Sequence, residues 1–339
     1  YQLHYRHVRR IPRPLEGPGK GPTLLAFTGS GLLIAYYHGV VTYIRDHFHL
    51  DNTRLSAISG GCSAVLGLGM GLDLYEVLLL GLRLKQTILR ERLYLHKVED
   101  VAAMMREEFE GIGITNEDVE RLSRRKQAFF GVTQCFPPGH RCVNVPDTVD
   151  DLIALMLCSC CVLPFFATPG VFKGRYYVDG CFSAFWSVPE DQPWEDVVRF
   201  TSVPSGISAV SAAGAHVQPS RLLLWEMMVP VVWEDQIALI ERGYQDARAQ
   251  HAMLEARGMR PRADAPLTPW SEWQRLYRSI DEHNLPPASR RRVTAASTER
   301  EKAHDELLRT HSETDLTSCL GGASLRRLTE GGDGKRGSQ

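Results

Sequence analysis

The chain has 339 residues, of which 43% are hydrophobic and 23% charged, and its net charge is −1. This composition is typical of a globular protein with one large domain plus extensions, and its balanced charge gives no general attraction to nucleic acid. Residues 1–13 are basic and polar and do not resemble a secretory signal, and eight cysteines without an obvious pairing favour a reducing, intracellular compartment.

Apolar periodicity predicts alternating strands and helices in the first 200 residues. The predicted strands are 23–28, 54–58, 128–133, 175–178 and 197–202. The predicted helices are 32–47, one from 65 onward, 73–95, 98–110, 148–161 and, further along, 232–257. This alternation predicts an α/β fold with a largely parallel sheet.

Composition divides the chain into three parts. Residues 1–22 are basic and rich in proline and glycine, which predicts a flexible leader. Residues 23–258 carry the strand–helix pattern and form the predicted domain, with its motifs between 24 and 190. Residues 259–339 are polar, and we expect a largely disordered extension.

One apolar run, 152–167, has to be weighed as a membrane span. Ser159 interrupts it, it contains Pro164, and it is shorter than the roughly 20 residues that a span needs. We interpret it as a buried core helix. Cys158, Cys160 and Cys161 lie in this run, but their spacing is not that of a zinc site, so we predict small buried side chains and no metal.

The first predicted strand ends in Gly29-Ser30-Gly31, where a helix opens. Such a turn presents backbone N–H groups to negative charge, which suits an oxyanion hole or a dinucleotide phosphate. The dinucleotide pattern needs a small residue at the sixth position and an acidic residue after the next strand. Ile34 stands at the sixth position, and the next strand ends in Ile58-Ser59. A plain strand–helix turn is the third interpretation.

The second predicted strand runs into a glycine-rich turn that is typical of a nucleophile elbow, with small residues two before and two after the nucleophile. In one register Cys62 is the nucleophile, with Gly60, Gly61 and Ala64 around it. In the other it is Ser63, with Gly61 and the β-branched Val65 at the flanking positions. A glycine-rich loop without chemistry also fits.

Asp179 and Gly180 follow the short strand 175–178. Asp-Gly is a common turn dipeptide, so taken alone it indicates a turn. Its importance as a candidate catalytic acid comes from its combination with the glycine turn and the elbow.

Together these segments resemble the patatin-like phospholipases, and most closely the branch of adipose triglyceride lipase and adiponutrin. The resemblance covers about residues 24–190 and, less closely, residues up to 258. The segments that carry it are 24–31, 36–47, 58–64, 151–160, 164–171, 174–180 and 243–248.

The resemblance implies a three-layer α/β sandwich and a nucleophile–Asp dyad that needs neither a histidine nor a cofactor. Asp179 would accept the proton of the nucleophile, Ser63 or Cys62. The backbone of Gly29, Ser30, Gly31 and Leu32 would form the oxyanion hole. An ungapped count from Gly31 to the elbow favours Cys62.

We therefore expect a lipid acyl hydrolase that cleaves carboxylic esters of acylglycerols or phospholipids through an acyl-enzyme intermediate. Because Cys62 and Cys181 depart from the family pattern, a weak or inactive lipid-binding protein is the alternative, and a nucleotide-binding α/β enzyme is the third. The expected partner is a lipid at a membrane or droplet surface, inside the cell. The apolar segment 74–84 could dock there, although it fits a core helix better.

Overall fold

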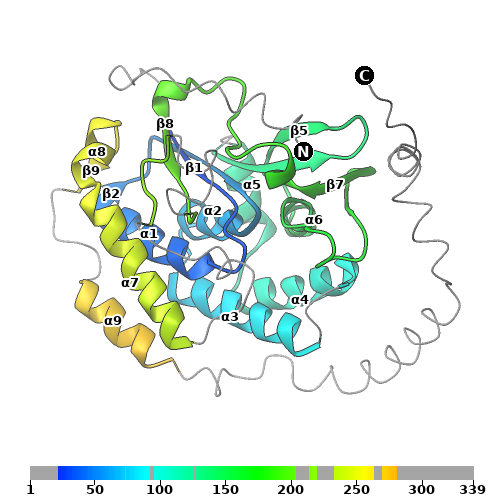
Figure 1. The fold of residues 1–339 in the computed structure, drawn as a ribbon, viewed down its shortest axis with the longest axis horizontal. Helices are drawn as coiled ribbons and strands as arrows, with labels where there is room; N and C mark the ends of the chain where they lie inside the picture. The colour runs from blue at the N-terminus through cyan, green and yellow to red at the C-terminus, as the bar shows by residue number, and fades with distance from the viewer. Residues whose placement is uncertain are drawn as a thin grey trace, which may run out of the picture. The chain divides into compact units, whose positions relative to one another are not determined.

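A mixed sheet organises the computed structural model of the chain, which describes residues 22–72, 74–91, 95–124, 127–203, 214–219, 233–262 and 269–280 (Figure 1). Its seven strands have the order β6-β7-β4-β3-β1-β8, and β5 pairs with β4 off this path. They are β1 (Thr23–Phe27), β3 (Thr53–Ile58), β4 (Ala128–Gln134), β5 (Gly139–Asn144), β6 (Gly170–Phe172), β7 (Arg175–Asp179) and β8 (Val197–Phe200). β2 (Phe48–His49) and β9 (Arg260–Pro261) pair separately, antiparallel.

Strand direction makes the sheet mostly parallel. β8, β1, β3 and β4 are parallel neighbours, while β5 and β7 run antiparallel to β4. β6 is antiparallel to β7 and so runs with the parallel set. The predicted α/β fold is therefore confirmed, as a mixed and mostly parallel sheet flanked by helices.

Side chains on the strands alternate between two faces, as strand geometry requires. On β1, Leu25 and Phe27 join the main hydrophobic core. Leu24 and Ala26 point to the other face and pack with Val197 in a smaller cluster. Every residue of β1 is buried, which explains why the sequence shows a continuous apolar run there and not an alternation.

Nine α-helices are found among the described residues, and all contribute side chains to the main core. They are α1 (Ile34–His47), α2 (Cys62–Gly69), α3 (Leu74–Glu91), α4 (Val98–Gly111), α5 (Asn116–Arg124), α6 (Val149–Ser159), α7 (Trp233–Ala249), α8 (His251–Ala256) and α9 (Trp270–Arg278). Helices α1 and α7 approach closely because glycines face each other's backbone. A Cβ on Gly39 would overlap the Ile240 carbonyl oxygen, and one on Gly243 would overlap that of Tyr36.

Several boundaries differ from the predicted ones. The predicted helix 232–257 is interrupted at Gln250, so that α7 and α8 are separate, and α6 ends at Ser159, two residues before the predicted end. Helix α2 begins at Cys62 and not at Val65. Strands β5 and β6 and helix α5 were not predicted.

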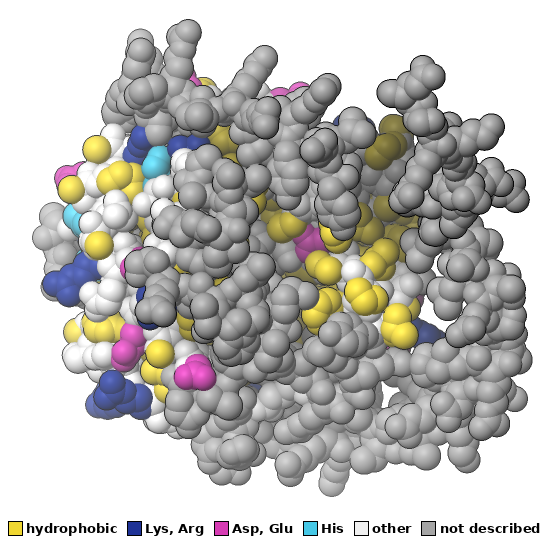
Figure 2. Space-filling view, viewed as in Figure 1, with side chains coloured by type: hydrophobic (Ala, Val, Ile, Leu, Met, Phe, Trp, Pro, Cys, Tyr) yellow, Lys and Arg dark blue, Asp and Glu magenta, His cyan; other side chains and the backbone are white. Residues whose placement is uncertain are grey.

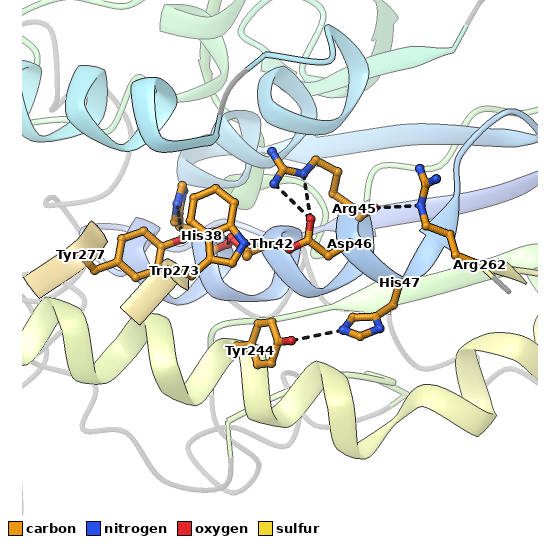
Figure 3. Close-up of polar contacts among 9 residues, drawn as sticks. All are labelled: His38, Thr42, Arg45, Asp46, His47, Tyr244, Arg262, Trp273 and Tyr277. Atoms are coloured by element: carbon orange, nitrogen blue, oxygen red, sulfur yellow. Dashed lines mark hydrogen bonds and ion pairs between the residues drawn. The ribbon is translucent and has the colours of Figure 1, made fainter. Parts of the chain in front are cut away.

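The packed residues extend past Gly258, where the predicted domain ends. Trp273 and Tyr277 on α9 are buried, and Trp273 Nε1 donates to Asp46 Oδ2 on α1 at 2.7 Å (Figure 3). The Tyr277 hydroxyl lies 3.1 Å from His38 Nε2. Because Asp46 is itself fully buried and paired with Arg45, α9 completes the surroundings of a buried charge. Residues 281–339 of the predicted extension lie outside the described residues.

Two membrane-related expectations concern helices. The apolar face of α3 is buried, with Leu74, Leu78 and Leu82 in the main core, so the interpretation of segment 74–84 as a core helix is confirmed. Among the described residues, no helix has the length and apolar character needed to cross a bilayer.

We expect Trp273→Phe to lower the free energy of unfolding by about 2–4 kcal/mol, because it removes the hydrogen bond to a buried carboxylate and leaves a small void. Urea unfolding followed by circular dichroism measures this loss. Trp270→Phe is the matched control, since Trp270 stacks on Tyr244 and its loss costs about 1 kcal/mol. Equal losses in the two variants would show that the hydrogen bond to Asp46 does not anchor α9.

Candidate active site

The candidate site forms where two strands meet end to end on one edge of β4. A strand has only two edges, and β5 occupies one of them along 129–134. Strands β3 and β7 therefore share the other edge, with Ile58 opposite Gly131 and Asp179 opposite Val132. The carboxyl ends of both strands thus lie next to each other, which brings the segments after Ile58 and around Asp179 together.

Ser59 stands at the turn that follows β3. Its φ is +54°, in the left-handed region that residues other than glycine rarely adopt. A single turn of 3₁₀ helix, Ser59–Gly61, then leads directly into α2. A sharp strand–turn–helix with a strained serine at its start is the geometry of a nucleophile elbow. Ser59, which the sequence interpretation passed over, is the residue at its apex.

The two glycines after Ser59 let the elbow pack against the turn that follows β1. A Cβ on Gly60 would overlap Ser30 Oγ and lie 2.9 Å from the Gly31 carbonyl oxygen. A Cβ on Gly61 would lie 2.6 Å from the Thr28 carbonyl oxygen. The Gly-Gly pair is therefore a packing requirement, because it brings Ser59 against the glycine turn.

The two predicted nucleophiles do not occupy the apex. The buried Cys62 lies in the first turn of α2, with its Sγ 3.6 Å from Ser159 Oγ on α6. The Ser63 hydroxyl donates to the Gly60 carbonyl oxygen at 2.9 Å, within its own helix. Ala64 is buried in the core. Both predicted registers placed the apex too late, since the helix has already begun at Cys62.

Asp179 is almost fully buried, with 1% of its surface exposed. Its Oδ1 accepts a hydrogen bond from the Cys181 backbone N–H at 2.8 Å. Burial raises the pKa of the Asp179 carboxyl, and hydrogen bonding from Ser59 and Cys181 partly offsets this rise. Its Oδ2 is buried and forms no well-aligned hydrogen bond with a described residue. Oδ2 is thus the oxygen available to receive a proton from Ser59.

Gly180 permits this placement of Asp179. A Cβ on Gly180 would overlap the Gly131 carbonyl oxygen and lie 2.8 Å from Ile58 Cγ2. The Asp-Gly pair therefore combines a carboxylate with a close approach of the chain to β4 and β3.

The glycine turn after β1 lies against Ser59. A Cβ built on Gly29 would lie 3.2 Å from Ser59 Cβ and 3.8 Å from Ser59 Oγ. Gly31 has a φ of +53°, and the Leu33 N–H closes the turn on the Ser30 carbonyl oxygen at 3.0 Å. Within the described part of the chain, the N–H groups of Ser30, Gly31 and Leu32 donate to no backbone carbonyl. These groups are the donors available for an oxyanion.

Cys181 adds a thiol to this site. Cys181 is an exposed residue, but its Sγ lies so close to Gly29 that a Cβ on that glycine would overlap it. Burial of the thiol, followed by the neighbouring Asp179 charge, raises its pKa well above the usual range. Hydrogen bonding from the Gly29 N–H opposes this rise. The thiol sulfur thus accepts a hydrogen bond from the Gly29 N–H, which is the first donor of the predicted oxyanion hole.

A buried tyrosine holds the start of the glycine turn. The Tyr37 hydroxyl, on α1, lies 3.0 Å from the Thr28 carbonyl oxygen and 3.2 Å from that of Phe200, toward which it donates. It accepts from the Ser202 N–H at 3.2 Å, and burial raises the pKa of this phenol. Thr28 in turn donates to the hydroxyl of Thr201 at 3.1 Å. One side chain thus ties α1 to the ends of β1 and β8.

Ser159 holds the elbow in the same way. Its hydroxyl accepts from the Ser59 N–H at 3.0 Å and donates to the Gly131 carbonyl oxygen at 2.8 Å. The interruption of the apolar run by a serine therefore has a structural cause. Among the described residues, no group of three His, Cys, Asp or Glu side chains is placed to hold a metal.

Comparisons with known proteins identify similar structures. No family model matches the sequence, and no curated protein matches it. VipD from Legionella pneumophila is similar with a TM-score of 0.41 and 11% identity, over 69% of this chain and 67% of that chain. The ExoU-SpcU complex from the type III secretion system of Pseudomonas aeruginosa is similar with a TM-score of 0.38 and 17% identity. The match covers 90% of this chain and 63% of the other, so this chain spans less than two thirds of that protein's length.

We expect Tyr37→Phe to lower the free energy of unfolding by about 2 kcal/mol, because the buried Ser202 N–H and the Thr28 carbonyl oxygen lose the hydroxyl that binds them. In the same variant, amide hydrogen exchange at residues 28–33 should be faster than in the wild type. The exposed Tyr176 gives the matched control, since Tyr176→Phe should change stability by less than about 0.5 kcal/mol. Unchanged exchange at 28–33 in Tyr37→Phe would contradict the bracing of the turn.

Proposed function

We propose that the chain is a lipid acyl hydrolase in which Ser59 is the nucleophile and Asp179 the base. The observation that carries this proposal is the strained φ of Ser59 at a strand–helix turn that faces a buried carboxylate. Strain of this kind costs about 1–3 kcal/mol and is typical of functional positions. The lipid character of the substrate, the patatin-like family and its triglyceride lipase branch rest on the sequence resemblance.

In the proposed reaction, Ser59 Oγ attacks the ester carbonyl carbon while its proton passes to Asp179 Oδ2. The carbonyl oxygen becomes an oxyanion, which accepts hydrogen bonds from the turn 29–32. Collapse of this intermediate releases the alcohol, which takes the proton from Asp179, and leaves an acyl group on Ser59. Water then attacks the acyl-enzyme with Asp179 again as the base, and Asp179 returns this proton to Ser59 Oγ as the bond to the acyl group breaks and the fatty acid departs.

The raised pKa of Asp179 fits this role. A general base works best when its pKa lies near the working pH, and burial moves the pKa of this carboxyl upward in that direction. The proposed place of action is a membrane or droplet surface inside the cell, where such substrates gather.

A weak or inactive lipid-binding protein is the second candidate. The observation that favours it is the Cys181 thiol, which lies on Gly29 and takes the N–H that an oxyanion would use. In this alternative the protein binds a lipid without turning it over.

We expect a fluorophosphonate probe to label Ser59 in the wild type, as located by peptide mass spectrometry. Label is lost in Ser59→Ala and reduced at least about tenfold in Asp179→Asn, because the serine then lacks its base. Ser63→Ala is the matched control, since that hydroxyl is bound to Gly60 within α2, and label persists in it. Label on Ser63, or no label in the wild type, would contradict the assignment of Ser59 as the nucleophile.

We expect Cys181→Ala to raise the rate of labelling and of ester hydrolysis about tenfold, because the Gly29 N–H becomes free for the oxyanion and one such donor is worth about 10²–10³ in rate. The pH dependence should also shift upward, since the variant loses the thiol hydrogen bond that lowers the pKa of Asp179. Cys135→Ala serves as the control. A rate that falls or stays constant in Cys181→Ala would show that the thiol does not obstruct the site.

A further inference from the structure

Exposed apolar side chains gather at the carboxyl end of the sheet, close to the candidate site. Phe136, between β4 and β5, is 84% exposed, while Tyr176 on β7 and Val171 on β6 are 58% and 50% exposed. Val171 and Tyr176 are direct partners across the β6–β7 hairpin. The Cys135 N–H donates to the Tyr176 carbonyl oxygen at 2.9 Å, which places Phe136 beside them. We call Phe136, Val171 and Tyr176 the hairpin surface.

The turn of this hairpin carries positive charge at its tip. Lys173 and Gly174 have φ values of +47° and +72°, and they form a two-residue connection of the kind that glycine and asparagine favour. A lysine in this conformation is strained, so the fold holds an ammonium group at the tip at some cost. Lys173 and Arg175 are exposed, and neither forms an ion pair with a described residue.

Negative charge is absent from the sequence of these segments. Positions 127–146 and 152–178 contain no aspartate or glutamate. The exposed apolar side chains are therefore bordered by cations without acidic neighbours in the sequence.

The hairpin surface continues toward the candidate site. Strand β7 runs from the hairpin tip down to Asp179, and Phe182, three residues further, is 46% exposed. In Figure 2, hydrophobic side chains gather to the right of centre, over the region where Figure 1 labels α6 and β7. A ligand on the hairpin surface would thus lie at the same end of the sheet as Ser59.

We infer that the hairpin surface, together with Lys173 and Arg175, docks on a lipid bilayer that contains anionic headgroups. Apolar side chains with an amphipathic tyrosine suit the boundary of the acyl chains, and exposed cations beside them suit anionic headgroups. The inference rests on the proposed lipid acyl hydrolysis, because docking there would bring a lipid ester to Ser59. It assigns docking to the β6–β7 hairpin and not to α3.

The test is vesicle flotation of the full chain, with phosphatidylcholine vesicles that contain or lack phosphatidylglycerol. The triple variant Phe136→Ser/Val171→Ser/Tyr176→Ser should lose binding to both. Lys173→Glu/Arg175→Glu should lose roughly thirtyfold in affinity, and only for vesicles with phosphatidylglycerol. Trp194→Ser is the control, because Trp194 is 44% exposed but precedes β8, at the opposite end of the parallel strands. It should float like the wild type.

Hydrolysis of a water-soluble short-chain ester separates this inference from the proposed function. It should depend on Ser59 and remain unchanged in the triple and charge-reversed variants. Variants that float like the wild type, a wild type that does not float, or an equal loss in Trp194→Ser would overturn the docking surface. A wild type that floats through these residues but never hydrolyses the soluble ester would support the docking surface and count against the proposed hydrolase.

Discussion

The geometry of the site depends on the limited edge of one strand. Because β5 occupies one edge of β4, β3 and β7 must share the other, and their ends meet. Two glycines make this junction possible: a Cβ on Gly180 would overlap the Gly131 carbonyl oxygen, and one on Gly131 would lie 2.7 Å from Ile58 Cγ1. The pairing of β3 and β7 with β4 thus sets how far Ser59 lies from Asp179. Paired strands in a core are among the most rigid parts of a protein.

Buried hydroxyl groups on helices fix the two turns that the sheet leaves open. Tyr37 reaches from α1 to the turn after β1, and Ser159 reaches from α6 to the turn after β3. Each joins two separate backbone segments in an environment without competing water, where a satisfied polar network confers rigidity. Such rigidity suits a site whose donors must be aimed before the reaction begins.

The sequence predicts the elements that have strong apolar periodicity. It misses features that depend on strand pairing or on the sign of a backbone φ angle. Strands β1, β3 and β4 were predicted because they are buried apolar runs, whereas β5 has no fully buried residue and β6 has only three residues, so both are defined by their partners. The signal for α9 was present, since Trp270, Trp273 and Tyr277 have helical spacing, but the polar composition around them concealed it.

The candidate site shows the same division. The glycine turn and Asp179 both lie next to Ser59, and their roles as oxyanion hole and base stay predictions. The apex of the turn was predicted too late in the sequence because the rule of small flanking residues is met in several registers. It is also met by Ala57-Ile58-Ser59-Gly60-Gly61, with Ser59 at the centre. Only the backbone distinguishes these registers, because a positive φ leaves no trace in composition.

The positive φ of Ser59 favours a different residue for stability than the proposed reaction requires. Glycine adopts a positive φ without the clash that a side chain brings, so glycine is the residue that stability alone would favour at this position. A sequence optimised only to fold would lose its hydroxyl here, and with it any nucleophile facing Asp179. Sequence design aimed at a more stable version of this fold would therefore first remove the hydroxyl on which the proposed chemistry depends, unless position 59 is held fixed.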